Sequence, residues 1–247
     1  MPVSESYREA AERHARESRF IFLGKFERDG SNLSLAPPNS NPAVIRVERV
    51  FRAAPALGNQ QGQLVTLMRA APGPMPDADG DLVVFSNPVL YGETLAVREI
   101  AHLRAPDDVD ELGAVLQRAI EGADMDTLRQ HLASATAIVV GKVVETKPAE
   151  EPGHIPFSEH DPDWWIATIH VTRSLKGRLK GDIRVRYANS RDVAWYRAPK
   201  PREGQEAIFV LHEDGARDAR GVPLAILHPE DMLPADPDNI RRINDLL

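Results

Sequence analysis

The chain has 247 residues, of which 42% are hydrophobic and 27% charged, the composition of an ordinary soluble globular protein. Its longest apolar runs are about five residues, too short to span a membrane, and its net charge of −7 argues against general affinity for nucleic acid or anionic lipid. The absence of cysteine excludes disulfides, thiolate nucleophiles and cysteine-based zinc sites. The charged N-terminus has no apolar segment of signal-peptide length, so we expect a cytoplasmic protein.

In the first half, the hydrophobic periodicity predicts a leading surface helix, five strands and a closing helix. Short strands separated by long turns rich in Pro and Gly are typical of a small β domain. The predicted elements are a helix at Glu5–Arg19, strands at Phe20–Phe26, Ala43–Val50, Gln63–Met68, Asp81–Ser86 and Thr94–Ile100, and a helix at Asp107–Glu121.

The second half repeats this order. At a constant offset of 117 residues, His14, Gly24 and Lys25 fall on His131, Gly141 and Lys142 without a gap. The offset then drifts, which places insertions and deletions in loops, as expected of a structural repeat. The predicted elements are a helix at Asp124–Ser134, strands at Ala137–Val144, Trp164–Thr172, Asp182–Tyr187, Gln205–Leu211 and Leu224–Leu227, and a helix at Asn239–Leu247.

Five short strands per copy favour a small closed barrel, because closure removes the exposed sheet edges. The sequence therefore predicts a mainly β protein with flanking helices, made of two tandem five-stranded OB-like Greek-key barrels. The first would occupy residues 1–122 and the second residues 123–247, each with a helix at both ends.

The second half also resembles a known family. The strand Ala137–Val144 is followed by IATIHVTRSLKG (Ile166–Gly177), by DIRVRY (Asp182–Tyr187) and by GQEAIFVL (Gly204–Leu211). This series is similar to the netrin-like barrel of tissue inhibitors of metalloproteinases, and the first half resembles it more weakly. The resemblance implies a fold rather than an activity, since the family inhibits through an N-terminal cysteine that chelates the target's zinc. This chain has no cysteine and carries a helix before the strand, so metalloproteinase inhibition is not implied.

A basic segment stands out in the second half. Residues 173–202 contain ten Lys and Arg against two Asp, a net charge of +8, with aromatic residues interleaved. OB-type barrels bind oligomers on the face of their middle strands, with basic groups along the backbone and aromatic rings stacked on bases. The segment is thus a candidate site for single-stranded nucleic acid or another polyanion, with a solvated charged face as the alternative. The candidate ligand-binding residues are Arg184, Arg186, Tyr187, Trp195, Tyr196 and Arg197.

The alternation in DIRVRY predicts that Arg184 and Arg186 lie on the outer face of their strand. Alignment of the two halves pairs these arginines with Val65 and Leu67, so the first copy does not share the basic feature.

Aromatic residues of the second half suggest a protein interface instead. Exposed aromatics flanked by Arg are typical interface anchors, which makes Trp164 and Trp195 candidates for binding a partner protein. The adjacent Trp164 and Trp165 must point to opposite faces of their strand, one of them into the core. Packing of these aromatics between the two barrels is the alternative.

Evidence for metal or catalysis is weaker. His154, His160 and Asp163 share one loop and could hold a divalent ion in a metal-assisted enzyme, but their spacing fits no known ligand signature. We interpret His212 as part of a turn, and His14 and His131 as equivalent packing positions. Asp107-Asp108 and Glu230-Asp231 are expected to cap helices.

No nucleophile elbow or nucleotide-binding glycine motif is present. The sequence therefore predicts a non-enzymatic module without a cofactor that binds another protein or acts as a scaffold. Nucleic-acid or polyanion binding is the first alternative, and a metal-assisted enzyme is the second.

Overall fold

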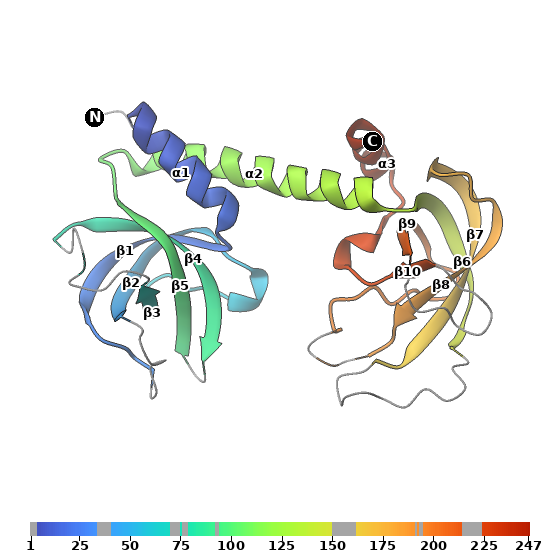
Figure 1. Ribbon diagram of the computed structural model, residues 1–247, viewed down its shortest axis with the longest axis horizontal. Helices are drawn as coiled ribbons and strands as arrows, with labels where there is room; N and C mark the ends of the chain where they lie inside the picture. Colours follow the sequence, from blue (N-terminus) through green and yellow to red (C-terminus); the bar gives the residue numbers. More distant parts are fainter. Residues whose placement is uncertain are drawn as a thin grey trace. The chain divides into compact units, whose positions relative to one another are not determined.

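The computed structural model describes residues 4–33, 41–69, 75, 79–91, 94–149, 162–190, 192, 195–213 and 224–247. The chain divides into two compact units, Met1–Asp124 and Met125–Leu247. Each unit contains a closed five-stranded barrel (Figure 1). The predicted mainly β fold of two such barrels is confirmed.

The first barrel closes in the strand order β1-β2-β3-β5-β4. Neighbouring strands are antiparallel except β3 and β5, which are parallel, so the barrel is mixed. A short 3₁₀ helix, η1 (Pro55–Leu57), lies between β2 and β3. The strands are β1 (Phe20–Asp29), β2 (Asn41–Arg52), β3 (Leu64–Arg69), β4 (Asp81–Tyr91) and β5 (Thr94–Arg104).

The second barrel has the same topology. Its strands follow the order β6-β7-β8-β10-β9, with a parallel pair between β8 and β10, and β9 closes the ring by pairing with both β10 and β6. A 3₁₀ helix, η2 (Pro229–Asp231), and a sixth strand, β11 (Met232–Pro234), follow the barrel, and β11 pairs with β9. The barrel strands are β6 (Ala137–Pro148), β7 (Trp164–Lys176), β8 (Gly181–Ala188), β9 (Glu206–Glu213) and β10 (Leu224–Ile226).

The described residues form three α-helices: α1 (Glu5–Glu17), α2 (Val109–Ser134) and α3 (Pro237–Leu246). The prediction of two helices on either side of residues 122 and 123 is wrong, because α2 runs through both positions as one helix. A lone glycine such as Gly122 costs only about 1 kcal/mol in a helix and does not break it. As predicted, Asp108 caps the helix start, where its Oδ1 accepts a hydrogen bond from the Glu111 backbone N–H at 2.8 Å.

Each barrel has one core inside and a second core on its outer surface. In the first barrel, Phe20 and Phe22 face the interior, whereas Ile21 and Leu23 face outward against α1 and the first part of α2. In the second barrel, the last part of α2 and α3 cover the outer faces of β6 and β9. This double burial explains why these strands read as continuous apolar runs rather than as alternating ones.

The first strand of each barrel is bent at equivalent positions. The β1–β2 ladder has register shifts at Ile21/Phe22, Leu23/Gly24 and Phe26/Arg28. The β6–β7 ladder has them 117 residues later in each case, at Ile138/Val139, Val140/Gly141 and Val143/Glu145. Bulges of this kind coil a strand enough to close a small barrel. The bulges therefore show that the two copies share a detailed backbone design, and not only an order of elements.

The glycines of the repeated Gly-Lys pair sit at the closest approach of these strands. A Cβ on Gly24 would lie 2.6 Å from Ile45 Cγ2 and 2.7 Å from the carbonyl oxygen of Arg46. A Cβ on Gly141 would lie 2.6 Å from Ile169 Cγ2 and 2.8 Å from the carbonyl oxygen of His170. Both positions require glycine, because atoms of the neighbouring strand occupy the space that a side chain would need.

Among the described residues, no helix combines the length and the apolar character needed to cross a membrane.

Candidate functional site

Strand β8 alternates between the barrel interior and the outer face, as its sequence predicts. Val185 and Tyr187 belong to the interior core. Tyr187 is only 3% exposed, and burial raises the pKa of its phenol. Arg184 is half-buried and Arg186 is buried on the opposite face. The ring of Tyr187 is thus a core group without a surface for stacking.

The strand registers correct the alignment of the two copies by one residue. Ile45 pairs with Val65 in the first barrel, and the equivalent Ile169 pairs with Ile183 in the second. The counterparts of Arg184 and Arg186 are therefore Thr66 and Met68, and not Val65 and Leu67. A shift of one residue moves a side chain to the other face of the strand, so Val65 and Leu67 are interior residues.

Arg186 is held in an aromatic stack on the outer face of the second barrel. Its guanidinium carbon lies 3.8 Å from the centroid of the Trp164 ring, which places the cation directly over the indole. Trp195 meets Trp164 edge-on, with ring centroids 5.7 Å apart and an interplanar angle of 69°. Trp165 points the other way and packs against the interior core, as expected for adjacent strand residues. Trp164 and Trp195 therefore pack on each other within the second unit.

This stack supports a surface turn at residues 195–198, which we term the Trp195 turn. The Ala198 backbone N–H donates to the Trp195 carbonyl at 3.0 Å. The Lys200 ammonium donates to the carbonyls of Trp195 at 3.0 Å, Ala198 at 3.2 Å and Tyr196 at 3.4 Å. One side chain thereby holds three carbonyls of the turn, whose backbone is fixed from both sides.

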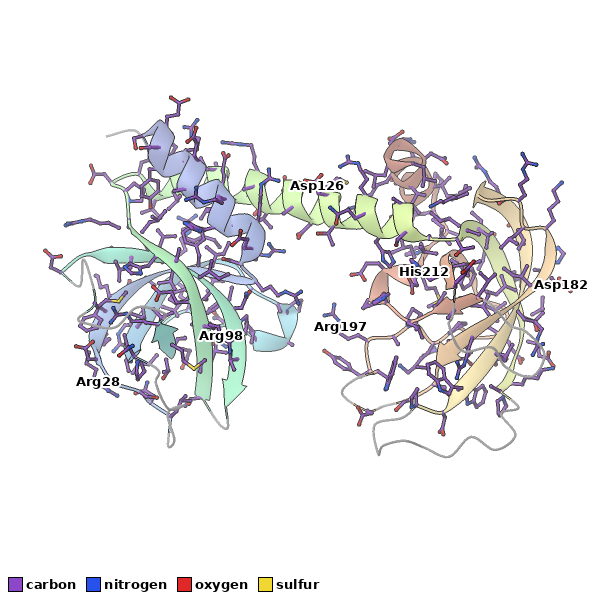
Figure 2. All side chains as sticks on the ribbon, in the orientation of Figure 1. Arg28, Arg98, Asp126, Asp182, Arg197 and His212 are labelled. Carbon is purple, nitrogen blue, oxygen red and sulfur yellow. The ribbon has the colours of Figure 1, made fainter. Side chains whose placement is uncertain are left out.

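The turn presents two side chains to solvent. Tyr196 is 55% exposed, the highest value among the large hydrophobic residues described. Arg197, labelled in Figure 2, is exposed beside it on the connection between β8 and β9. An exposed aromatic ring and a guanidinium on a braced turn can insert into an apolar pocket and pair with a carboxylate.

Other cations of the basic segment have structural or solvated positions. The Lys176 ammonium donates to the carbonyls of Leu132 and Ala133, at 2.9 and 2.7 Å, and so caps the C-terminal end of α2. Arg173, Arg178 and Lys180 are exposed. The described cations of the basic segment therefore divide between those with structural contacts and those exposed to solvent.

The metal site predicted from one loop falls largely outside the described residues. His154 and His160 lie among residues 150–161, whose structure is not described. Asp163 is exposed, and its carbonyl accepts a hydrogen bond from the Asn189 backbone N–H at 2.9 Å.

A different group of titratable residues converges in the second unit. The fully buried carboxylate of Asp231, in η2, is approached by His131 at the end of α2 and by His212 at the end of β9. His131 Nε2 lies 2.6 Å from Asp231 Oδ1, and His212 Nε2 lies 3.3 Å from the same oxygen. His228 stands edge-on to His131, with ring centroids 5.5 Å apart. We term these four residues the histidine cluster; Figure 2 labels His212.

The protein backbone orients the carboxylate of this cluster. Asp231 Oδ2 accepts hydrogen bonds from the backbone N–H groups of Leu227 and His228, at 2.7 and 2.8 Å. These bonds leave Oδ1 facing the imidazoles. The expected capping role of Asp231 is thus present, and the same side chain also meets two histidines.

His212 is the poorly satisfied member of the cluster. Its Nε2 is buried and has no hydrogen-bond partner of good geometry among the described residues, although Asp231 Oδ1 lies 3.3 Å away. Burial lowers the pKa of His212, the Asp231 carboxylate opposes that shift, and the neighbouring imidazoles of His131 and His228 reinforce it.

Among the described residues of the first copy, no such cluster surrounds His14, the histidine that aligns with His131. His14 packs against the Phe85 ring, with centroids 5.6 Å apart. Burial lowers the pKa of His14, with a further lowering by Arg13 and an opposing effect of Glu17. The packing role predicted for this pair of histidines fits His14, whereas His131 also binds a buried carboxylate.

Sequence reasoning assigned His131, His212 and Asp231 to separate local roles, gave His228 none, and missed their convergence. The signal lay in the topology: Ala137 of β6 pairs with Leu211 of β9, so residues just before β6 and just after Leu211 meet at one end of the barrel. His131 and His212 occupy those positions.

Comparisons with protein-family models and with curated proteins find no match to the chain.

Proposed function

We propose that the protein is a non-enzymatic binding module whose second barrel anchors another protein through the Trp195 turn. The observation that carries this proposal is the exposed Tyr196–Arg197 pair on a backbone braced by Lys200 and by the stack in which Trp164 contacts both Arg186 and Trp195. A turn that is ordered before binding loses little conformational entropy on association, so more of its contact energy appears as affinity.

The chemistry of the turn selects the partner class. Tyrosine and arginine are enriched among residues that dominate binding energy, and an aromatic anchor requires an apolar pocket. Arg197 adds a guanidinium at the end of a basic segment, within a chain of net charge −7. We therefore propose an acidic protein segment as the ligand, with Tyr196 inserted between apolar side chains and Arg197 paired with a carboxylate.

The strand order supports a finer classification of the barrels. A closed five-stranded Greek-key barrel with its third and fifth strands parallel is the arrangement expected of an OB-type domain, and the sequence resemblance points to its netrin-like form. We propose this classification for both copies. It implies no zinc-chelating inhibition, because the N-terminal cysteine is lacking.

The rival proposal of single-strand binding has less support. Of its three candidate aromatic rings, Tyr187 is in the core and Trp195 packs against Trp164, which leaves Tyr196 as the exposed ring. Arg186 is likewise engaged with Trp164. Base stacking requires free aromatic faces in series, and these residues do not offer one.

A peptide selection tests the proposal. Random peptides selected on the full-length protein should be enriched in Asp and Glu and contain apolar residues. Their affinity should fall about 30-fold in Tyr196→Ala, since loss of a hot-spot residue costs about 2 kcal/mol. Val144→Ala is the matched control, because Val144 is a 49% exposed apolar residue of the same barrel. Selected peptides that bind Tyr196→Ala as tightly as the wild type would exclude the Trp195 turn as the anchor.

The alternative of single-strand binding requires a separate experiment. Fluorescence anisotropy of a labelled mixed-sequence DNA single strand, at about 50 and 200 mM salt, reports polyanion binding. The variants Arg173→Glu and Arg178→Glu change exposed cations without disturbing the stack. Binding at low salt that both variants abolish would replace the acidic-peptide proposal by a polyanion-binding one.

A further inference from the structure

The histidine cluster brings together two imidazole nitrogens and one carboxylate oxygen from three different elements, α2, β9 and η2. The ligand atoms of His131, His212 and Asp231 all lie within 4.8 Å of one another. We propose that these three residues form a binding site for a divalent transition-metal ion, most suitably Zn²⁺.

The donor set fits this ion. Zn²⁺ binds imidazole nitrogen and carboxylate oxygen at about 2.0–2.2 Å, and a tetrahedral arrangement then separates neighbouring ligand atoms by roughly 3.3 Å. His212 Nε2 and Asp231 Oδ1 are already 3.3 Å apart. His131 Nε2 is closer to Oδ1, at 2.6 Å, so this pair must open by roughly 0.7 Å to admit the ion. Mg²⁺ and Ca²⁺ prefer sites built from oxygen alone and fit less well.

The surroundings of the carboxylate favour a metal ligand. Metal-binding carboxylates are commonly held by hydrogen bonds to their other oxygen, which fixes their orientation. The backbone N–H groups of Leu227 and His228 hold Asp231 Oδ2 in this way. Oδ1 is thereby directed at the two imidazoles.

A hydrogen-bonded Asp–His pair explains His131 but leaves His212 unexplained. His212 Nε2 is buried and has no hydrogen-bond partner among the residues described. Buried polar atoms without partners cost free energy and are rare unless a ligand satisfies them. A metal ion among the three side chains would satisfy this nitrogen, and the hydrogen on His131 Nε2 would move to Nδ1.

Two other histidines of the chain provide matched controls. His14 occupies the equivalent position in the first copy but contacts Phe85 rather than a carboxylate. His170 binds Asp182 on the surface through Nδ1, at 2.7 Å, and both side chains are more than half exposed. His14 controls for binding to any partly buried histidine, and His170 controls for binding to an ordinary surface His–Asp pair.

Isothermal titration calorimetry with ZnCl₂ on the untagged full-length protein, after chelator treatment, tests the site. We expect one Zn²⁺ per chain, at least tenfold weaker binding in His131→Gln and His212→Gln, and affinity within twofold of wild type in His14→Gln and His170→Gln. MgCl₂ should produce no saturable heat. Absence of stoichiometric Zn²⁺ binding, or equal losses in the control variants, would overturn the proposal.

A second measurement covers the case in which a variant binds poorly because it folds poorly. All three tryptophans lie in the second unit, so their fluorescence reports its unfolding. ZnCl₂ should raise the thermal midpoint of the wild type and of His14→Gln, because an ion that binds the folded state stabilises it. The midpoint of His212→Gln should not respond, and an equal response in that variant would exclude His212 as a ligand.

Discussion

The close approach at Gly141 provides the sharpest stability test of the barrel design. Replacement by alanine places a methyl group 2.6 Å from Ile169 Cγ2 and 2.8 Å from the His170 carbonyl oxygen. Real Cβ contacts do not occur at such distances, so atoms must move. The oxygen belongs to β7, which pairs with β6 along the bulged ladder, and it cannot retreat without opening that pairing.

The size of the destabilisation depends on whether the atoms that the new methyl group meets can move. Overpacking by one methyl group costs about 1–3 kcal/mol when side chains can adjust. Because backbone is involved at Gly141, we expect Gly141→Ala to lower the free energy of unfolding by about 3 kcal/mol, the upper end of this range. With a urea dependence of about 2 kcal/mol per M, the midpoint would fall by roughly 1.5 M.

Tryptophan fluorescence during urea unfolding is the appropriate assay, since Trp164, Trp165 and Trp195 all lie in the second unit. Gly24→Ala creates the equivalent clash in the first unit, which contains no tryptophan. It should shift the transition seen by far-ultraviolet circular dichroism. A shift of the tryptophan transition as well would mean that the two units unfold together.

Gly122→Ala is the control for the general effect of replacing glycine. A Cβ at this position of α2 meets nothing within 4 Å. Alanine should therefore stabilise the helix by about 0.5–1 kcal/mol, opposite in sign to the barrel variants. A Gly141→Ala midpoint within about 0.2 M of the wild type, a difference of about 0.4 kcal/mol, would refute the close approach of β6 and β7.

Two titrating side chains of α1 give further predictions. Burial raises the pKa of Tyr7 to about 12, and its hydroxyl is buried without a hydrogen-bond partner among the described residues. Tyr7→Phe should remove a phenolate absorbance step near pH 12 and leave the free energy of unfolding unchanged or up to about 1 kcal/mol higher; a step that persists would contradict this. The pKa of His14 is lowered by burial, so the unfolded state binds more protons just below pH 6.5 and stability falls there as the pH falls. Circular dichroism melts at pH 7.5 and 5.5 should show a smaller loss for His14→Gln than for the wild type, and equal losses would exclude His14 as a contributor.

Much of the fold could be predicted because strand and helix periodicity is local. The Gly-Lys repeat identified the two copies, and its glycines prove to share the same steric environment. The break expected near residues 122 and 123 does not occur, and α2 continues through Gly122. A helix continues unless a strong breaker such as proline interrupts it, and no proline is present there. The one-residue error at Val65 and Leu67 arose because loop insertions hide the register, which only the ladder with β2 fixes.

The candidate sites were predicted less completely, because they depend on contacts between distant parts of the chain. Alternation placed Arg186 on the outer face, but the Trp164 ring over which it lies was assigned a separate role. Asp231 was interpreted through its neighbours in sequence, and its contact with His131 spans 100 residues. Hydrophobic periodicity does not show which distant residues come into contact. The pairing of β6 with β9 does show it for His131 and His212.

The two copies share the positions that close a barrel and differ at both candidate sites. Positions needed to close a barrel are the same in both: the three bulges, the glycine after the second bulge, and the apolar faces beneath the helices. The Trp195 turn and the histidine cluster lie outside this shared set. Met68 stands where the second barrel has Arg186, and His14 meets a phenylalanine where His131 meets a carboxylate. The first barrel closes without counterparts of the Trp195 turn and the histidine cluster, so barrel closure in the second unit does not require them. The binding experiments on each of these two sites therefore test whether they serve a binding role instead.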